Sequence, residues 1–230
     1  CQRFPAGYGE RHKAVNTLII SGGNIEVDFA LEVLKKPFDQ IIGVDGGLFF
    51  CQEHQIMPTV AVGDFDTLPP DILKWYKTHT DLEIREYNPI KDAADTQIAV
   101  ELAMESGSTD ITVLGATGTR LDHVLGNIQM LYLPLEKGIR CELLDRHNRI
   151  RLIRNSHVIR KKEQYGTYFS LIPFTTDVYG VTLKGAKYPL EQYHFTVLGT
   201  GSLGVSNEIV KEQVEISMES GILILIESKD

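Results

Sequence analysis

The sequence Thr59-Val60-Ala61-Val62-Gly63-Asp64-Phe65-Asp66-Thr67 places two carboxylates directly after a short apolar run. The run Val60–Val62 predicts a buried strand that ends at Gly63. Residues i and i+2 of an extended chain project to the same side, so we expect Asp64 and Asp66 to face one small space beyond the strand. Oxygen ligands of this kind suit Mg²⁺. For this stretch alone, the alternative is a polar turn with solvated carboxylates.

The residues around this stretch predict an α/β fold. From Val15 to Leu144, short apolar runs alternate with amphipathic segments, which is typical of βαβ units and a mainly parallel sheet. We expect strands at Thr17–Ile20, Ile41–Val44, Val60–Val62, Glu83–Glu86, Ile111–Leu114 and Cys141–Leu144. The expected helices are Val27–Lys35, Gly47–Glu53, Pro70–His79, Ala94–Glu105 and Leu121–Leu133.

After Asp145 the pattern changes to short strand-like runs separated by Gly, Asn, Asp or Ser, which predicts an all-β sandwich or barrel. The runs are Ile150–Arg154, Thr167–Ile172, Val178–Leu183, Phe195–Leu198, Gln213–Met218 and Ile222–Ile226. The expected organisation is therefore a mainly parallel α/β domain at 14–145 and a β-sandwich domain at 146–230. We expect residues 1–13 to be a leader, or a segment derived from an expression vector, outside the fold.

Four predicted strands end in flexible or acidic residues. Open α/β sheets bind ligands in a crevice beyond the carboxyl ends of their strands, so these four ends predict one shared site. They are Ser21-Gly22-Gly23, Asp45-Gly46-Gly47, Gly63–Asp66 and Gly115–Arg120. At the second of them, Asp45 can bond a ribose hydroxyl or a base, although Asp45-Gly46-Gly47 is equally typical of a plain tight turn.

A second acidic segment, Asn88–Asp95, precedes a predicted helix. Asp92 and Asp95 fall about one helical turn apart, on one face of the helix start. With Asp64 and Asp66 they predict a set of four carboxylates around one or two divalent ions, and Lys91 offsets part of that charge or reaches a phosphate. Acids at this position are equally typical of plain helix capping.

The segment Gly115-Ala116-Thr117-Gly118-Thr119-Arg120 follows one strand and opens a helix. Backbone N–H groups and a helix N-terminus hold phosphate in such an arrangement. It lacks the Gly-Lys-Ser/Thr of a Walker A loop and is no full G-x-G-x-x-G. Arg120 can clamp phosphate oxygens in bidentate fashion, and it shares one helix face with His123 and Asn127. His123 by itself is more typical of an ordinary helix residue than of a catalyst.

Composition excludes several classes of protein. The formal charge of −8 over 230 residues, with no basic stripe, argues against a nucleic-acid-binding function. The longest aliphatic run, Ile222–Ile226, is too short to span a bilayer. Three widely spaced cysteines without a C-x-x-C predict unpaired thiols and a reducing, cytoplasmic setting.

Five blocks of this chain, in order, closely resemble the thiamine pyrophosphokinase family. They are Asp45-Gly46-Gly47, Gly63–Asp66, Lys91–Asp95, Gly118–His123 and Gly204-Val205-Ser206-Asn207-Glu208. The resemblance implies transfer of the pyrophosphoryl group of ATP to the thiamine hydroxyl, giving thiamine diphosphate and AMP. It also implies Mg²⁺, an N-terminal α/β domain followed by a C-terminal β-sandwich, and a homodimer with sites shared between subunits.

Residue roles follow from the residues and the resemblance together. We expect a metal set of Asp64, Asp66, Asp92 and Asp95, and a catalytic set of Asp66, Asp92, Asp95, Arg120 and Asp122. The expected ATP-binding residues are Asp45, Gly46, Gly47, Lys91, Gly115, Thr117, Gly118, Thr119, Arg120 and Asn127. The resemblance assigns Ser206 and Asn207 to the thiamine pyrimidine, from the partner subunit.

Two other functions remain open from the sequence. One is another Mg²⁺-dependent nucleotide enzyme, either a nucleotidyltransferase or a phosphohydrolase. The other is a non-catalytic sensor of thiamine or a nucleotide that has kept the fold. Formation of AMP only in the presence of thiamine would distinguish the kinase from another nucleotide enzyme. The intact set of four carboxylates argues against a non-catalytic sensor, which has no need of them.

Overall fold

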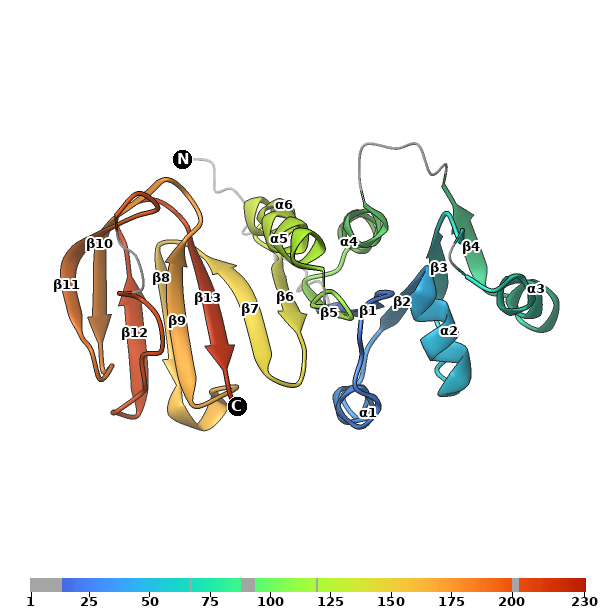
Figure 1. The fold of residues 1–230 in the computed structure, drawn as a ribbon, viewed down its shortest axis with the longest axis horizontal. Helices are drawn as coiled ribbons and strands as arrows, with labels where there is room; N and C mark the ends of the chain where they lie inside the picture. The colour runs from blue at the N-terminus through green and yellow to red at the C-terminus, as the bar shows by residue number, and fades with distance from the viewer. Residues whose placement is uncertain (1–13, 67, 88–93, 119, 200–202) are drawn as a thin grey trace, which may run out of the picture.

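The computed structural model describes residues 14–66, 68–87, 94–118, 120–199 and 203–230, which form two β-sheets and their covering helices (Figure 1). The large sheet has nine strands and the small sheet has four. In sheet order the large one contains β4 (Glu83–Glu86), β3 (Val60–Gly63), β2 (Gln40–Val44), β1 (Asn16–Ile20), β5 (Asp110–Leu114), β6 (Arg140–Leu144), β7 (Asn148–Ile153), β13 (Leu223–Ser228) and β9 (Tyr168–Pro173).

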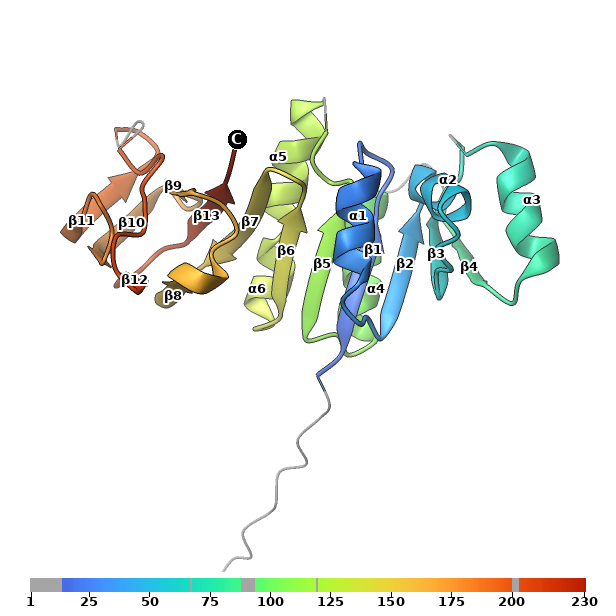
Figure 2. The same cartoon turned by 90° about the horizontal axis from the view of Figure 1, so that it is seen from below.

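The first six strands of the large sheet, from β4 to β6, are parallel and run side by side (Figure 2). Strand β1 shows why this sheet is buried on both faces: Leu18 and Ile20 pack toward one helical layer and Ile19 toward the other. The helices are α1 (Val27–Leu34), α2 (Gly46–Glu53), α3 (Pro70–His79), α4 (Asp95–Glu105), α5 (Leu121–Met130) and α6 (Tyr132–Glu136). Helices α4 to α6 lie on one face and α1 to α3 on the other (Figure 1).

The predicted helix 121–133 is divided in the structure at Leu131. Pro134 accounts for the break, because it has no N–H to donate and its ring crowds the carbonyl four residues earlier, that of Met130. The first helix of the pair, α5, still carries the predicted face of Arg120, His123 and Asn127, all of which line one cavity.

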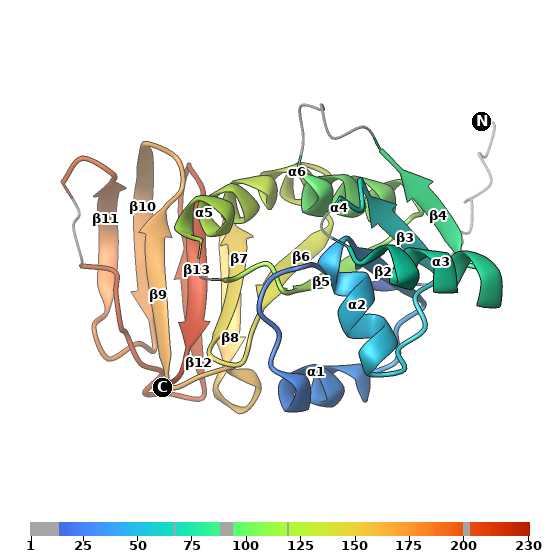
Figure 3. The same cartoon turned by 45° about the vertical axis from the view of Figure 1, so that its right-hand side comes forward.

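The large sheet continues without interruption across the change of pattern at Asp145. Strand β6 pairs antiparallel with β7 through Leu143–Ile150 and Leu144–Arg149, and β7 pairs with β13 (Figure 3). The segment 145–148 is therefore the turn at which the sheet passes from parallel to antiparallel pairing. A domain boundary there, at 145/146, stays a prediction about folding units.

The small sheet packs on the antiparallel part of the large one and makes the predicted sandwich. Its order is β11 (Leu190–Thr196), β10 (Asp177–Lys184), β12 (Gln213–Ser217) and β8 (Ser156–Arg160), with a short 3₁₀ helix, η1 (Lys161–Glu163), after β8. Phe169 and Leu225 of the large sheet share a buried core with Val181, Phe195 and Val214 of the small one. The predicted fold class, an α/β domain followed by a β-sandwich, is confirmed.

In the second half one strand prediction was wrong and one strand was missed. The expected strand 195–198 is instead β11, which ends at Thr196 and leaves Val197 and Leu198 exposed in a turn. Strand β8 was missed because its residues Ser-His-Val-Ile-Arg alternate poorly and bury only Ile159 on the sandwich core. Because β8 is an edge strand that pairs only with β12, a single buried side chain is enough to hold it on the core.

Candidate active site

The sheet order places a ligand crevice between β1 and β5. The chain leaves β1 toward β2 on one side, and after β4 it returns to β5 on the other side. Such a reversal of strand order opens a crevice at the carboxyl ends of the two central strands. In this chain those ends are the Ser21–Gly23 and Gly115–Gly118 turns, two of the four strand ends expected to meet.

A cavity of about 420 Å³ occupies this crevice. Its volume lies within the range of small-molecule sites, about 300 to 1,000 Å³. Three turns, the start of α4 and one face of α5 form its walls, and we call it the nucleotide cavity after the ligand that the sequence predicts. Among the residues that line it are Ser21, Gly22, Gly23, Asn24, Asp45, Gly46, Asp95, Thr96, Gly115, Ala116, Gly118, Arg120, His123 and Asn127.

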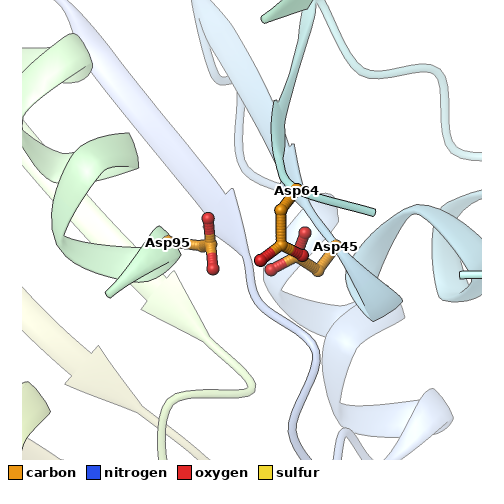
Figure 4. A group of neighbouring side chains, drawn as sticks. All are labelled: Asp45, Asp64 and Asp95. Atoms are coloured by element: carbon orange, nitrogen blue, oxygen red, sulfur yellow. The ribbon is translucent and has the colours of Figure 1, made fainter. Parts of the chain in front are cut away.

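Three carboxylates gather beside this cavity. Asp45 precedes α2, Asp64 follows β3 and Asp95 begins α4, and one carboxylate oxygen from each lies within 4.8 Å of the others. Figure 4 shows the three side chains pointing toward one another. We call these residues the acidic triad.

Backbone geometry around Gly63 brings Asp45 into the triad. A Cβ atom at Gly63 would lie 1.7 Å from Asp45 Oδ1, so only glycine leaves room for this carboxylate. Asp45 itself has a positive φ of 44°, and its Oδ1 accepts a hydrogen bond of 3.2 Å from the N–H of Phe65. The strained backbone at Asp45 is the kind of feature that concentrates at functional sites.

The electrostatics of the triad favour a cation. Burial, followed by the neighbouring charge of Asp95, raises the pKa of Asp45 from 3.8 to about 7; a hydrogen bond to Asp95 and the charge of Asp64 act in the same direction. Burial and repulsion together thus favour the protonated form of Asp45 up to about neutral pH. A hard divalent cation such as Mg²⁺, which prefers carboxylate oxygens, fits this donor set.

The geometry around Asp66 differs from the extended chain assumed above. Phe65 has φ 57° and is buried, so the chain turns between Asp64 and Asp66. The N–H of Asp66 donates to Asp64 Oδ1 at 3.2 Å, and the Asp66 side chain is exposed rather than part of the triad. The extended-chain premise was therefore wrong, and a ligand role for Asp66 stays a prediction.

Arg120 and Asp122 form a bidentate ion pair at the start of α5. Arg120 donates from Nε to Asp122 Oδ1 at 3.2 Å and from a terminal nitrogen to Oδ2 at 2.6 Å. These hydrogen bonds lower the pKa of Asp122 to about 2. Both side chains are exposed, by 68% and 65%, so a phosphate group can compete with Asp122 for Arg120.

The turn after β5 is held from several sides. The N–H of Gly23 donates to the carbonyl of Gly115 at 3.0 Å, and Asn127 Nδ2 donates to the carbonyl of Ala116 at 2.8 Å. Thr117 lines a neighbouring cavity of about 540 Å³ instead of the nucleotide cavity. Asn127 and Thr117 therefore shape the turn, in addition to any contact with a ligand.

The two residues assigned to thiamine have different environments. Ser206 is exposed with a positive φ of 57°, and its N–H donates to Ser170 Oγ at 3.0 Å. Asn207 is buried, and its amide is occupied: Oδ1 accepts from the N–H of Tyr188 and Nδ2 donates to the Tyr188 carbonyl. Neither residue lines the nucleotide cavity of its own chain.

The remaining predicted residues divide into three groups. The residues that line the nucleotide cavity are Asp45, Gly46, Asp95, Gly115, Gly118, Arg120 and Asn127. Gly47 is buried and does not line it, and a Cβ atom there would lie 2.1 Å from the carbonyl oxygen of Ile20. Asp122 lines an adjoining cavity with His123 and Asn127. Lys91, Asp92 and Thr119 lie outside the described residues.

Three further residues line the nucleotide cavity without having been predicted as site residues: Ser21, Asn24 and Thr96. Ser21 and Thr96 join β1 to α4 through a buried contact of 2.6 Å between their hydroxyl oxygens. Ser21 was part of a strand end already expected to face the crevice, so its place was within reach of the sequence. Thr96 follows Asp95 by one residue and gave no signal of its own.

The sheet order and the crevice are typical of an α/β enzyme, and the triad offers a set of carboxylates that fits a cation. Family models identify the particular family: the thiamin pyrophosphokinase catalytic domain matches residues 31–143, and the thiamin pyrophosphokinase vitamin B1 binding domain matches residues 156–223. The chain therefore belongs to the thiamin pyrophosphokinase family, and the predicted enzyme class is confirmed.

Individual relatives agree with the family models. The chain is 35% identical to thiamine pyrophosphokinase of Bacillus subtilis over 189 residues, which covers 82% of this chain and 87% of the relative. A crystal structure of thiamine pyrophosphokinase from Bacillus subtilis matches with a TM-score of 0.82 and 34% identity, over 94% of this chain and 99% of that one. The Geobacillus thermodenitrificans structure matches with a TM-score of 0.81 and 31% identity, over 94% and 98%.

Proposed function

We propose that this chain binds ATP and a divalent cation, Mg²⁺, in and beside the nucleotide cavity and transfers pyrophosphate from ATP to thiamine. The observation that carries the proposal is the acidic triad at one wall of a 420 Å³ cavity whose other walls include a glycine turn and Arg120. Negative side chains would repel a triphosphate unless a cation came with it. ATP with Mg²⁺ supplies both partners.

The reaction forms a bond between the thiamine hydroxyl oxygen and the β-phosphorus of ATP. The bond from that phosphorus to the bridging oxygen of the α-phosphate breaks, AMP leaves, and the hydroxyl proton passes to a carboxylate. Mg²⁺ held by Asp45, Asp64 and Asp95 would offset charge on the transferring group. Arg120 binds phosphate oxygens, and positioning of the two substrates supplies much of the rate.

The test is incubation of the purified chain with ATP, Mg²⁺ and thiamine, with AMP and thiamine diphosphate measured together. We expect equal amounts of both products, none without thiamine, and a large loss in Asp95→Asn. AMP or phosphate released without thiamine would identify a phosphohydrolase instead. Binding of ATP and thiamine without turnover would identify a sensor.

We also propose that the active form is a homodimer with shared sites. The described lining of the nucleotide cavity comes entirely from the N-terminal half, 21–127, and includes neither Ser206 nor Asn207. Exposed apolar side chains suit a subunit contact: Leu121 and Leu125 on α5 are 73% and 62% exposed, and Leu198 in the sandwich is 87% exposed. A symmetric dimer can bury both groups and bring Ser206 to the partner's cavity.

Mixed dimers test this arrangement. Asp95→Asn removes a triad carboxylate and Ser206→Ala removes the proposed thiamine contact, and each homodimer should have little activity. If sites are shared, the mixed dimer has one site with both lesions and one with neither, so activity reappears as subunits exchange. No recovery, with exchange confirmed by fluorescence transfer between labelled subunits, would mean that each chain builds its own site.

A cytoplasmic location remains part of the proposal. Cys51 and Cys141 are free and buried, and burial raises the pKa of Cys51 to about 12, so both behave as unreactive core residues suited to a reducing compartment. Of the helices that the structure describes, none is long and apolar enough to cross a membrane.

A further inference from the structure

The turn between β6 and β7 contains a carboxylate, that of Asp145, which does not line the nucleotide cavity. Asp145 Oδ1 accepts hydrogen bonds of 2.7 Å from the N–H groups of both His147 and Asn148, which fixes the turn. The other oxygen, Oδ2, accepts a hydrogen bond of 2.6 Å from the hydroxyl of Thr117. Asp145 thus connects its own turn to the turn that lines the nucleotide cavity.

The contact with Thr117 is of a strong kind. A hydroxyl that donates to a carboxylate at about 2.5 to 2.7 Å makes a charge-assisted hydrogen bond, roughly twice as strong as a neutral one. Asp145 has the fixed orientation that such a contact needs, because both of its oxygens are engaged. Thr117 therefore has one preferred position relative to β6.

The position of Thr117 sets the position of the cavity wall. Gly115 and Gly118 line both the nucleotide cavity and its neighbour, Ala116 lines only the nucleotide cavity, and Thr117 lines only the neighbouring cavity, together with Asp145. The Thr117 side chain therefore anchors the turn from the side away from the nucleotide cavity. Backbone N–H groups that bind phosphate must be held in place before the ligand arrives, because a turn that has to order on binding loses affinity.

Asp145 is in turn tied to the sandwich. Tyr165, from the segment after η1, donates its hydroxyl to the carbonyl of Asp145 and, at 3.2 Å, to that of Arg146. The N–H of Tyr165 donates to Glu227 Oε1 at 3.1 Å, and Glu227 is a buried residue of β13 bonded to Arg149 and Arg151. Hydrogen bonds thus link four residues in series, from Glu227 near the end of β13 through Tyr165 and Asp145 to Thr117 in the turn at the nucleotide cavity.

We propose that Asp145 is a positioning residue: its carboxylate holds Thr117 and thereby fixes the 115–118 turn for binding of the nucleotide phosphates. The inference rests on the proposed function, since it assumes that this cavity binds ATP. Asp145 touches no reacting atom, so its effect should fall on nucleotide affinity more than on turnover. Its connection to Tyr165 gives the C-terminal half a direct influence on that affinity.

The test compares steady-state kinetics of Thr117→Val, Asp145→Ala, the double variant and Thr117→Ser. Valine keeps the shape of threonine and removes the hydroxyl. We expect Thr117→Val to raise KM for ATP by about tenfold, which corresponds to about 1.4 kcal/mol, with kcat changed much less and KM for thiamine unchanged. Thr117→Ser, which restores the hydroxyl, should recover most of the loss.

Thr109→Val is the matched control. Thr109 lies just before β5, whereas Thr117 lies just after it. The Thr109 hydroxyl is also hydrogen-bonded, to the backbone of Val15, but at the opposite end of the strands from the nucleotide cavity. A general loss of stability would affect both variants alike, whereas positioning predicts a KM effect for Thr117→Val alone. The double variant should be no worse than Asp145→Ala, because Asp145→Ala already removes the hydrogen bond that Thr117→Val would break.

Three outcomes would overturn the inference. They are an unchanged KM for ATP in Thr117→Val, an equal change in Thr109→Val, and additive effects in the double variant. Failure of the proposed function is distinguishable from these, because the parent protein would then form no thiamine diphosphate from ATP.

Discussion

Replacing Asp45 by Asn should stabilise the metal-free protein while impairing its cation site. The pKa of Asp45 is raised from 3.8 to about 7 by burial and by the carboxylates of Asp95 and Asp64. Such an acid binds more protons in the folded than in the unfolded state between these two values. Its ionisation therefore leaves stability intact below about pH 4 and lowers it progressively as pH rises to about 7.

The magnitude follows from the size of the shift. One pKa unit corresponds to about 1.4 kcal/mol, so a fully buried group with this shift would cost about 4 kcal/mol above about pH 7. Asp45 is partly exposed, and solvent screening reduces the expected cost to about 2 kcal/mol. Asn has the same shape and can still accept the hydrogen bond from the Phe65 N–H, so the variant should recover this amount at pH 8 and little at pH 4.

The assay is urea unfolding at pH 4 and pH 8 with a chelator present, repeated at pH 8 with Mg²⁺. Mg²⁺ should stabilise the parent protein and have much less effect on Asp45→Asn, because the variant lacks one ligand of the triad. Asp81→Asn, an exposed acid in the loop before β4, serves as the control. An equal change in the free energy of unfolding at both pH values, or equal stabilisation by Mg²⁺, would refute the reasoning about the triad.

Three further predictions concern single residues. Arg120→Lys loses the planar fork and should lower kcat/KM by about tenfold or more without loss of stability; parental kinetics would make Arg120 a structural residue. Gly63→Ala places a methyl group 1.7 Å from Asp45 Oδ1, so it should abolish stabilisation by Mg²⁺ and lower the free energy of unfolding by about 1 to 3 kcal/mol. Gly107→Ala is the control, because Gly107 also has a positive φ but has open space around it. This variant should lose less stability and keep Mg²⁺ binding. Burial, followed by the charge of Arg151, lowers the pKa of His157 to about 4. As pH falls from about 6.5 to about 4, this histidine is protonated in the unfolded state first, which lowers the free energy of unfolding by roughly 2 to 3 kcal/mol. Urea unfolding across this pH range should show that the free energy of unfolding falls less steeply in His157→Gln than in the parent protein. An equally steep fall in both would contradict this role of His157.

The sequence by itself determined the arrangement of elements in the first half. Parallel strands are buried on both faces, so they appear as continuous apolar runs, and the runs at β2, β3 and β5 were located within a residue or two of their ends. The strand ends were equally visible, because Gly and Asp are disfavoured within a buried strand and therefore mark the residue at which it stops. Those two signals were enough to predict that the site lies at the carboxyl ends of the parallel strands.

Only the tertiary structure decided which side chains meet there. Asp45 and Asp64 lie at the ends of neighbouring strands and Asp95 begins a helix that crosses the sheet, so their contact depends on strand order, which local sequence does not encode. Asp66 was expected in the group because a straight chain was assumed, whereas Phe65 turns its backbone to bury its ring. The role of Asp145 was hidden for the same reason: its partner Thr117 is 28 residues away, and a hydrogen bond over that distance exists only after β5 and β6 have paired.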